Sequence, residues 1–117
     1  MTMHIFSDYL IVEDTYLAFV DGTKSTTRDK FFQQIAAAMQ FPDYFSHNLD
    51  SLDEIMSDLS WIEQEKINIL IFGYDQLLIN DNSALEAVHN IFAHVIANSD
   101  SFEKDITIYT QSVEDEA

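Results

Sequence analysis

The sequence predicts a small α/β protein with a mainly parallel sheet, and three observations lead to that prediction. Short runs rich in β-branched and aromatic residues alternate with longer runs in which apolar residues recur every three or four positions. One run, residues 66–74 (KINILIFGY), is almost wholly apolar, as in a central strand that is buried on both faces. Strands that are separated by helices pair in parallel through right-handed crossovers.

The chain starts with two short strands. Residues 9–20 (YLIVEDTYLAFV) are rich in β-forming residues but are interrupted near Glu13 and Asp14, which predicts a break between the strands. The second strand, residues 17–20, runs into a turn at Gly22, where we expect a positive φ angle.

The first helix follows this turn. Thr26 and Asp29 have the spacing of a capping box, and apolar residues recur at helical spacing through residues 31–40 (FFQQIAAAMQ). We expect the helix to end near Gln40, because Pro42 disfavours helical geometry in the residue before it.

The second helix is expected within residues 49–59. Leucine, isoleucine and methionine step there by three and four and form one apolar stripe. Asn48 is the expected N-cap, and Asp50 then falls in the first turn, where the helix dipole favours an acid.

The second half of the chain continues the alternation. Residues 66–74 are the central strand, and residues 80–83 offer several N-caps for a long helix that ends at residues 98–100. Residues 105–110 (DITIYT) alternate as a last strand, and we expect the acidic tail, residues 112–117, to fray. With no linker and no internal repeat, the whole chain is expected to form one domain.

The composition is that of a folded protein. With 117 residues, of which 47% are hydrophobic and 13% aromatic, the chain can bury a core. It has no cysteine for a disulfide or a thiol nucleophile, and no apolar run reaches the roughly 20 residues of a membrane span. The N-terminus lacks the basic region and cleavage site of a signal peptide. We expect a cytoplasmic protein that is monomeric when free.

The charge is strongly acidic. Twenty-one acidic residues face five basic ones, which gives a formal net charge of −16. Such a surface repels nucleic acid and anionic membranes. From residue 31 to residue 65 there are seven acids and no lysine or arginine. These acids either keep the protein soluble or form a face that attracts a basic partner, and composition alone does not choose between the two.

Nucleotide, cofactor and metal sites find little support. Neither a P-loop nor a dinucleotide fingerprint can be written with only two glycines, and we expect no cofactor. Glu86 and His89 have the Glu-x-x-His spacing of helical di-iron sites, but those sites need two such pairs and further glutamates. His47 and Asp50 can share a helix face, yet two ligands do not make a structural zinc site. We therefore expect no metal.

Carboxylate catalysis is a further alternative. Asp50 and Glu54 are neighbours at i and i+4 and can present both carboxylates to one substrate. The sequence offers no obvious nucleophile, oxyanion-stabilising loop or nearby base to complete such a site. We therefore do not expect an enzyme.

A binding face is the remaining interpretation. Four acids of the second helix have no base beside them, although like charges at i and i+4 destabilise an isolated helix by about 0.2–0.5 kcal/mol. They are Asp50, Asp53, Glu54 and Asp58. Tyr44 precedes the helix, and an aromatic ring with a polar tip next to acids suits docking onto a cationic pocket.

This segment also resembles a known family. Residues 41–56 (FPDYFSHNLDSLDEIM) closely resemble the signature of the barstar family, the small intracellular inhibitors of secreted microbial ribonucleases. The family pattern is proline, an acid, tyrosine, an aromatic residue, glycine, any residue, asparagine, leucine and aspartate, with an acid four residues later. The matching residues are Pro42, Asp43, Tyr44, Phe45, Asn48, Leu49, Asp50 and Glu54. By this resemblance, residues 1–14 are an N-terminal extension ahead of the family's first strand.

The resemblance implies a fold and a function. The fold is a three-stranded parallel sheet packed against about four helices, here with an extra N-terminal strand. The function is that of an inhibitor or immunity protein: the motif acids take the place of RNA phosphates and block the cationic site of a barnase-like ribonuclease toxin. Glu54 would enter the phosphate site and Asp50 would make a second charge pair one turn earlier. The residues expected to contact the partner are Tyr44, Ser46, Asn48, Asp50, Asp53, Glu54 and Ser57.

Four positions depart from the family pattern. Ser46 stands where the family usually has glycine, so the loop either follows another path or places Ser46 at an uncommon φ. Glu54 replaces the usual aspartate, Asp53 replaces a common tryptophan, and the family's further acid aligns near His94. These changes point to a different cognate partner, or to the alternative function of an acidic interaction module whose partner is not a nuclease.

Overall fold

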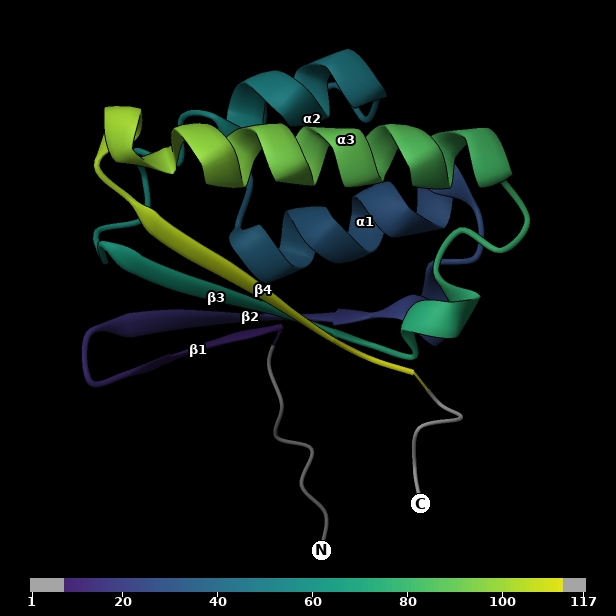
Figure 1. Ribbon diagram of the computed structural model, residues 1–117, viewed down its shortest axis with the longest axis horizontal. Coiled ribbons are helices and arrows are strands. Elements are labelled where there is room, and N and C mark those ends of the chain that lie inside the picture. The colour runs from purple at the N-terminus through teal and green to yellow at the C-terminus, as the bar shows by residue number, and fades with distance from the viewer. Residues whose placement is uncertain (1–7, 113–117) are drawn as a thin grey trace, which may run out of the picture.

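The computed structural model describes residues 8–112, which form a four-stranded sheet with α-helices on one face (Figure 1). The strands lie in the order β1-β2-β3-β4; β1 is antiparallel to β2, whereas β2, β3 and β4 are parallel. Their bounds are Tyr9–Val12 for β1, Thr15–Asp21 for β2, Lys66–Phe72 for β3 and Asp105–Gln111 for β4. The predicted N-terminal, central and last strands are thus confirmed. The tail that is predicted to fray lies outside the described residues, apart from Ser112.

The described residues form three α-helices on one side of this sheet: α1 (Arg28–Met39), α2 (Leu49–Met56) and α3 (Asn82–Asn98). The three parallel strands and the extra N-terminal strand agree with the expected fold, but the described part of the chain has three α-helices and not the expected four or so. Between β3 and α3 the chain forms only a 3₁₀ turn, Tyr74–Gln76, and Leu78 then takes a φ of 52°. A right-handed helix does not continue through such a residue. No helix among the described residues is long and apolar enough to cross a membrane.

The turn between β1 and β2 confirms the predicted break between these strands. Glu13 and Asp14 have positive φ angles of 49° and 67°, as the two central residues of a tight hairpin turn require. Val12 pairs with Thr15 across this turn. The two-residue loop thereby fixes the register of the whole β1-β2 pair.

The start of α1 differs from the prediction by one residue, whereas its end agrees. The N-cap is Thr27, whose hydroxyl accepts a hydrogen bond from the backbone N–H three residues later at 3.4 Å. Thr26 does not form the predicted capping box with Asp29, because its carbonyl accepts the backbone N–H of Asn80 at 3.0 Å and holds it in the loop. At the other end, Gln40 takes a left-handed φ of 54° and terminates the helix.

Gly22 is required for a reason other than the predicted one. The positive φ belongs to Gly73, at 61°, so the prediction of a positive φ at Gly22 is wrong. A Cβ atom on Gly22 would lie 2.3 Å from the carbonyl oxygen of Gly73 and 2.7 Å from that of Phe72. The close approach of the segments that follow β2 and β3 therefore excludes a side chain at this position.

The core lies between the sheet and the helices. In β3, Ile67, Ile69 and Ile71 point toward the helices and are buried. The residues between them, Asn68 and Leu70, are only half-buried on the opposite face. The prediction that this strand is buried on both faces is therefore wrong, because the described helices all pack on the same side of the sheet (Figure 1).

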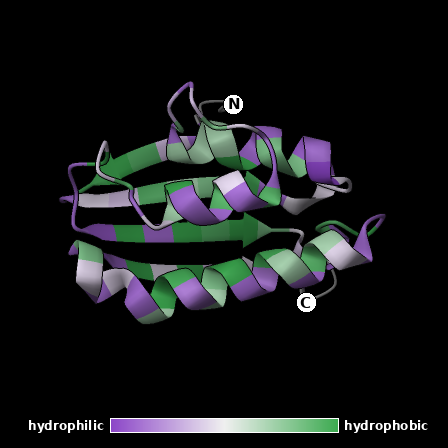
Figure 2. Ribbon diagram, turned by 90° about the horizontal axis from the view of Figure 1, so that it is seen from above, coloured by the Kyte–Doolittle hydropathy of each residue, from purple (hydrophilic) through white to green (hydrophobic). Residues whose placement is uncertain are grey.

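α2 is the helix that lies farthest from the sheet, above α1 and α3 (Figures 1 and 2). Leu52, Ile55 and Met56 point inward from it and are buried. Its outward side carries hydrophilic residues over the hydrophobic strands (Figure 2). This position leaves a whole side of α2 accessible to another molecule.

One ion pair joins the start of α1 to the start of α3. Arg28 Nε donates to Asp81 Oδ2 at 2.7 Å. Asp81 is also the N-cap of α3 and accepts the backbone N–H of Ala84 at 3.2 Å. The hydrogen bond from Arg28, followed by that from Ala84, lowers the pKa of Asp81 below its ordinary value.

We expect this pair to stabilise the fold less as the solution becomes acidic. A carboxyl group with a lowered folded-state pKa contributes in full above its unfolded pKa, about 3.9, and the contribution is lost as the pH falls through the folded-state pKa. Asp81→Asn keeps a capping oxygen but removes the charge. The difference in unfolding free energy between the unmodified protein and this variant should therefore shrink from pH 7 to pH 2, as measured by urea unfolding. If the difference in unfolding free energy stays constant from pH 7 to pH 2, the Asp81 charge does not stabilise the fold.

Candidate protein-binding surface

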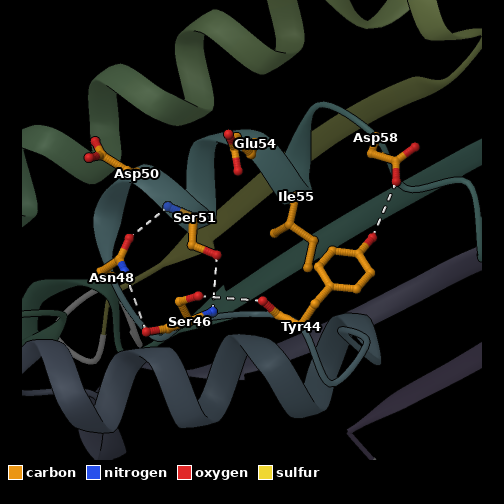
Figure 3. A pocket seen from close by; sticks show the side chains of 8 residues that line it. All are labelled: Tyr44, Ser46, Asn48, Asp50, Ser51, Glu54, Ile55 and Asp58. Carbon is orange, nitrogen blue, oxygen red and sulfur yellow. Dashed lines mark hydrogen bonds between the residues drawn. The ribbon is translucent and has the colours of Figure 1, made fainter.

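A hollow of about 300 Å³ opens on the outer side of α2, between this helix and the loop before it (Figure 3). It is lined by Tyr44, Ser46, Asn48, Asp50, Ser51, Glu54, Ile55 and Asp58. All of these residues lie between positions 44 and 58. The local folding of one short segment therefore builds the hollow.

The start of α2 is fixed by its N-cap, as the sequence predicts. Asn48 Oδ1 accepts the backbone N–H of Ser51 at 2.8 Å, and Asn48 itself has an extended backbone. Asp50 then lies in the first turn, which is also as predicted. Leu52, Ile55 and Met56 hold the inner side of the helix in the core, and Ile55 also reaches the hollow. The cap and the buried stripe together decide which side chains face the hollow.

Asn48→Ala is expected to lower the free energy of unfolding by about 1 kcal/mol, because the N–H of Ser51 loses its acceptor. Asn48→Asp retains an acceptor oxygen at the same place and should cost much less. Urea unfolding of the two variants measures both effects. Equal losses in the two variants would show that the cap is not the source of the stabilisation.

The loop before α2 is closed by short-range hydrogen bonds. The backbone N–H of Ser46 donates to Ser51 Oγ at 3.0 Å, and Asn48 Nδ2 donates to the carbonyl of Ser46 at 3.4 Å. Ser46 does not have a positive φ; His47 does, at 54°. The sequence leaves two alternatives for a serine in place of the family's glycine: an uncommon φ at Ser46 or a different loop path. The structure shows the different path, in which the left-handed residue is His47, one position later.

Aromatic packing anchors this loop to the core. Phe45 is buried, and its ring meets that of Phe32 edge to face at a centroid distance of 5.8 Å. The ring of His47 lies 4.9 Å from that of Phe45. Tyr44, by contrast, is 64% exposed, so the loop holds one aromatic ring inward and the next outward.

Three acids lie in a row along one edge of the hollow (Figure 3). Asp50 and Glu54 are four residues apart on α2, about one turn, or roughly 5.4 Å, along the axis, whereas Asp58 follows in the turn after the helix ends. All three are exposed, and none forms an ion pair with a lysine or arginine within residues 8–112. The row is therefore negative and has no compensating charge of its own.

Tyr44 lies across the hollow from this row. Its hydroxyl donates to Asp58 Oδ2 at 3.4 Å. Desolvation, followed by the nearby Asp58 carboxylate, raises the pKa of the Tyr44 phenol above its ordinary value. The phenol is thus a neutral hydrogen-bond donor at physiological pH, next to the negative charges of the acids.

The structure brings together five of the seven residues expected to contact a partner: Tyr44, Ser46, Asn48, Asp50 and Glu54 line the hollow. Asp53 and Ser57 do not. Successive residues of a helix are separated by about 100°, so Asp53 points away from the row and toward α3. Ser57 is the C-cap of α2.

Asp53 meets the residue at which the family's further acid aligns. Its Oδ1 lies 3.5 Å from Nδ1 of His94 on α3. This oxygen is buried and accepts no hydrogen bond from the described residues. His94 therefore sits beside Asp53 at the flank of α2 and not in the hollow.

Sequence reasoning did not assign Ser51 and Ile55 to the site, and it placed Asp58 on the acidic face but not among the contact residues, although all three line the hollow. Ser51 and Ile55 are four residues apart on α2, a helical spacing that could have found them. Ile55 belongs to the buried stripe and forms the floor of the hollow, so its apolar character alone does not reveal its place in the site.

The described residues support no metal site. Within them no group of three or more histidine or acidic side chains could hold a metal ion. His89, which has the Glu-x-x-His spacing with Glu86, instead has its Nε2 in contact with the Tyr74 hydroxyl, and the two rings stack at 5.6 Å. The chemistry that the surface offers is that of an exposed carboxylate row beside a phenol and an amide.

Comparison with known proteins points to one family. The family model described as Barstar (barnase inhibitor) matches residues 15–111. A search of curated proteins finds no match. The matched residues include every residue that lines the hollow.

Proposed function

The chain belongs to the barstar (barnase inhibitor) family, and from this membership we propose that it inhibits a ribonuclease by inserting the acidic edge of α2 into the enzyme's cationic active site. Inhibition of a barnase-type ribonuclease is what the family description implies. The use of this particular surface, and the residues named below, are our proposal.

The observation that carries the proposal is the uncompensated acidic row: Asp50 and Glu54 on α2, the helix farthest from the sheet, and Asp58 in the turn just after it. A ribonuclease active site holds RNA phosphates with cationic side chains. Carboxylates spaced by one helical turn offer such a site several negative charges on a rigid support. The long-range field of the chain, with a net charge of −16, also accelerates the encounter with a basic enzyme.

Each part of the surface has a proposed role. Glu54, in the middle of the row, enters the phosphate site, and Asp50 pairs with a second cation one turn earlier. Tyr44 supplies a large exposed ring with a hydroxyl at its tip, the kind of side chain that often dominates an interface. Asn48 and Ser46 are already hydrogen-bonded to their own loop, so binding costs little ordering of this segment.

Asp53 and Ser57 take supporting roles in this proposal. Asp53 is turned toward His94, and Ser57 ends the helix. They lie at the margin of the contact, where a charge affects the association rate more than the affinity. The proposed binding residues are therefore fewer on the side of α2 that faces His94 than the sequence predicts, and Asp58 adds a further charge at the end of the acidic row.

The proposal describes an inhibitor and not an enzyme. Asp50 and Glu54 are both exposed, and the hollow beside them has no histidine, lysine or arginine in its lining. A carboxylate pair in such a setting is better suited to pairing with a partner's cations than to proton transfer in a protected site.

Titration of the chain into a barnase-type ribonuclease tests the function. Cleavage of a fluorogenic RNA substrate should fall to zero at one equivalent of the chain, and the association rate should decrease as salt is raised from 50 to about 500 mM. An enzyme encoded beside this chain should be included. If no barnase-type ribonuclease is inhibited even at low salt, the proposed function is wrong.

A further inference from the structure

Three hydrogen bonds join the loop before α2 to the first turn of the helix in a closed triangle (Figure 3). The backbone N–H of Ser46 donates to Ser51 Oγ at 3.0 Å, and the backbone N–H of Ser51 donates to Asn48 Oδ1 at 2.8 Å. Asn48 Nδ2 closes the triangle by donating to the carbonyl of Ser46 at 3.4 Å. Each of the three residues therefore donates once and accepts once, and we call them the hydrogen-bonded triangle.

The triangle encloses a residue in an uncommon backbone conformation. His47, between Ser46 and Asn48, has a φ of 54°. A residue other than glycine stays in this left-handed region only where its surroundings hold it there. Ser46, His47 and Asn48 are all exposed, and the ring of His47 reaches the core only at its edge, against Phe45. The backbone on both sides of His47 is therefore held mainly by the triangle.

The path of this loop decides which way Tyr44 faces. The Ser46 hydroxyl donates to the carbonyl of Tyr44 at 3.5 Å, and the buried Phe45 between them anchors the loop. Within residues 8–112, the Tyr44 side chain makes one hydrogen bond, from its hydroxyl to Asp58 Oδ2 at 3.4 Å. A single long hydrogen bond at the tip holds an exposed ring weakly. The direction of Tyr44 therefore depends on the backbone that the triangle holds.

Ser51 is the member of the triangle that lies on a rigid support. The next residue, Leu52, is fully buried and holds this turn of α2 in place. The backbone N–H of Ser51 completes the helix cap on Asn48, and that cap needs no side chain at position 51. The hydroxyl of Ser51 has a separate contact, because it accepts the N–H of Ser46. An alanine at position 51 would keep the cap but release the loop.

We propose that Ser51 is a positioning residue for the binding of the ribonuclease. Through Ser46, its hydroxyl holds the loop so that Tyr44 faces the hollow beside the acidic row before the partner arrives. This inference rests on the proposed function and adds to it a residue that acts through Tyr44. The free chain thus already has the loop path that the complex needs, and association spends little free energy on ordering the loop.

Ser51→Ala is expected to weaken ribonuclease binding about fivefold, the change in an equilibrium constant that corresponds to one typical intramolecular hydrogen bond. Without the hydroxyl the loop samples other paths, and the apparent affinity falls with the fraction of chains that keep the binding path. Ser51→Thr keeps a hydroxyl on the same carbon and should restore the affinity to within about twofold. Isothermal titration calorimetry measures all variants at one salt concentration.

Ser101→Ala is the matched control. It removes another serine hydroxyl, which donates to the carbonyl of Asn98 at 2.7 Å, and it should leave the affinity unchanged. A general loss of stability does not change the affinity of a chain that remains almost wholly folded. The affinity therefore separates a positioning role of Ser51 from a merely structural one.

A double-mutant cycle tests whether Ser51 acts through Tyr44. In a Tyr44→Ala background there is no ring to position, so Ser51→Ala should cause little further loss. An equal loss of about fivefold in both backgrounds would overturn the proposal, and so would an unchanged affinity in Ser51→Ala alone.

Hydrogen exchange of the free chain tests the contact without any ribonuclease. The Ser46 amide should exchange with water about fivefold faster in Ser51→Ala, and at the wild-type rate in Ser51→Thr and Ser101→Ala, as measured by nuclear magnetic resonance. If the exchange rate is the same in Ser51→Ala, Ser51 does not hold the loop and the proposal is overturned. If no barnase-type ribonuclease binds the unmodified chain, the proposed function fails, while the exchange of Ser46 still decides whether Ser51 holds the loop.

Discussion

Glu54→Ala is expected to weaken the complex with the ribonuclease by about 2–5 kcal/mol, the usual cost of truncating one partner of a buried charge pair in an interface. Glu54 occupies the middle of the acidic row and has no cation of its own within the described chain. Its removal therefore leaves a cationic group of the enzyme unpaired. Asp50→Ala should cost a similar amount. Isothermal titration calorimetry at fixed salt measures both.

Asp53→Ala is the matched control. It removes an acid from the same helix, adjacent in sequence, but from the side that faces His94. We expect it to cost less than about 1 kcal/mol of affinity, as for a marginal charge. Asp58→Ala should mainly lower the association rate and its salt dependence. A loss below about 1 kcal/mol for Glu54→Ala, or an Asp53→Ala loss as large as that of Glu54→Ala, would contradict the assignment of the row.

Gly22→Ala is expected to destabilise the fold by about 3 kcal/mol or more, at the upper end of the usual range for overpacking. A Cβ atom would lie 2.3 Å from the carbonyl oxygen of Gly73, which belongs to backbone and cannot rotate away. The ends of β2 and β3 would then have to separate. Thermal and urea unfolding of the variant measure the effect.

Substitution by asparagine distinguishes the close contact at Gly22 from the positive φ that the sequence predicts there. Asparagine tolerates a left-handed backbone but still carries a Cβ atom. Gly22→Asn should therefore be as damaging as Gly22→Ala. At Gly73, whose φ is 61°, asparagine should be tolerated better than alanine. If Gly22→Asn were much less destabilising than Gly22→Ala, the backbone conformation of Gly22, and not its close contact, would explain the need for glycine.

Features that depend on a few consecutive residues could be predicted from the sequence. Asn48 as the N-cap, Asp50 in the first turn and the buried stripe of α2 follow from capping chemistry and helical spacing, and the structure confirms them. The hairpin break at Glu13 and Asp14 is likewise local. These features also position the candidate site, which lies within one short segment.

Features that depend on contacts between distant segments could not be predicted in this way. The need for glycine at position 22 arises from backbone about fifty residues later in the chain, near Gly73. Thr26 is drawn out of its predicted capping box by Asn80. Helical spacing predicts that Asp53 points away from Asp50 and Glu54, but not that it meets His94 of α3. Spacing along one helix gives the relative directions of side chains but not which neighbour each one meets.

The sheet shows the same limit at a larger scale. The apolar run of β3 predicts burial on both faces, and residues 8–112 cover only one of them. Lys66 and Asn68 lie on the uncovered face of β3, so the alternation along the strand indicates its buried face better than its overall apolar content does.

Nuclear magnetic resonance can locate the ribonuclease on the chain. The ¹⁵N-labelled chain is titrated with an unlabelled, catalytically inactive barnase-type ribonuclease, and the backbone amide shifts are followed residue by residue. The proposed function predicts that the largest changes fall on residues 44–58, with little change on β1 and β4. Changes concentrated on the strands, or unchanged amides of residues 44–58 in a saturated complex, would contradict it.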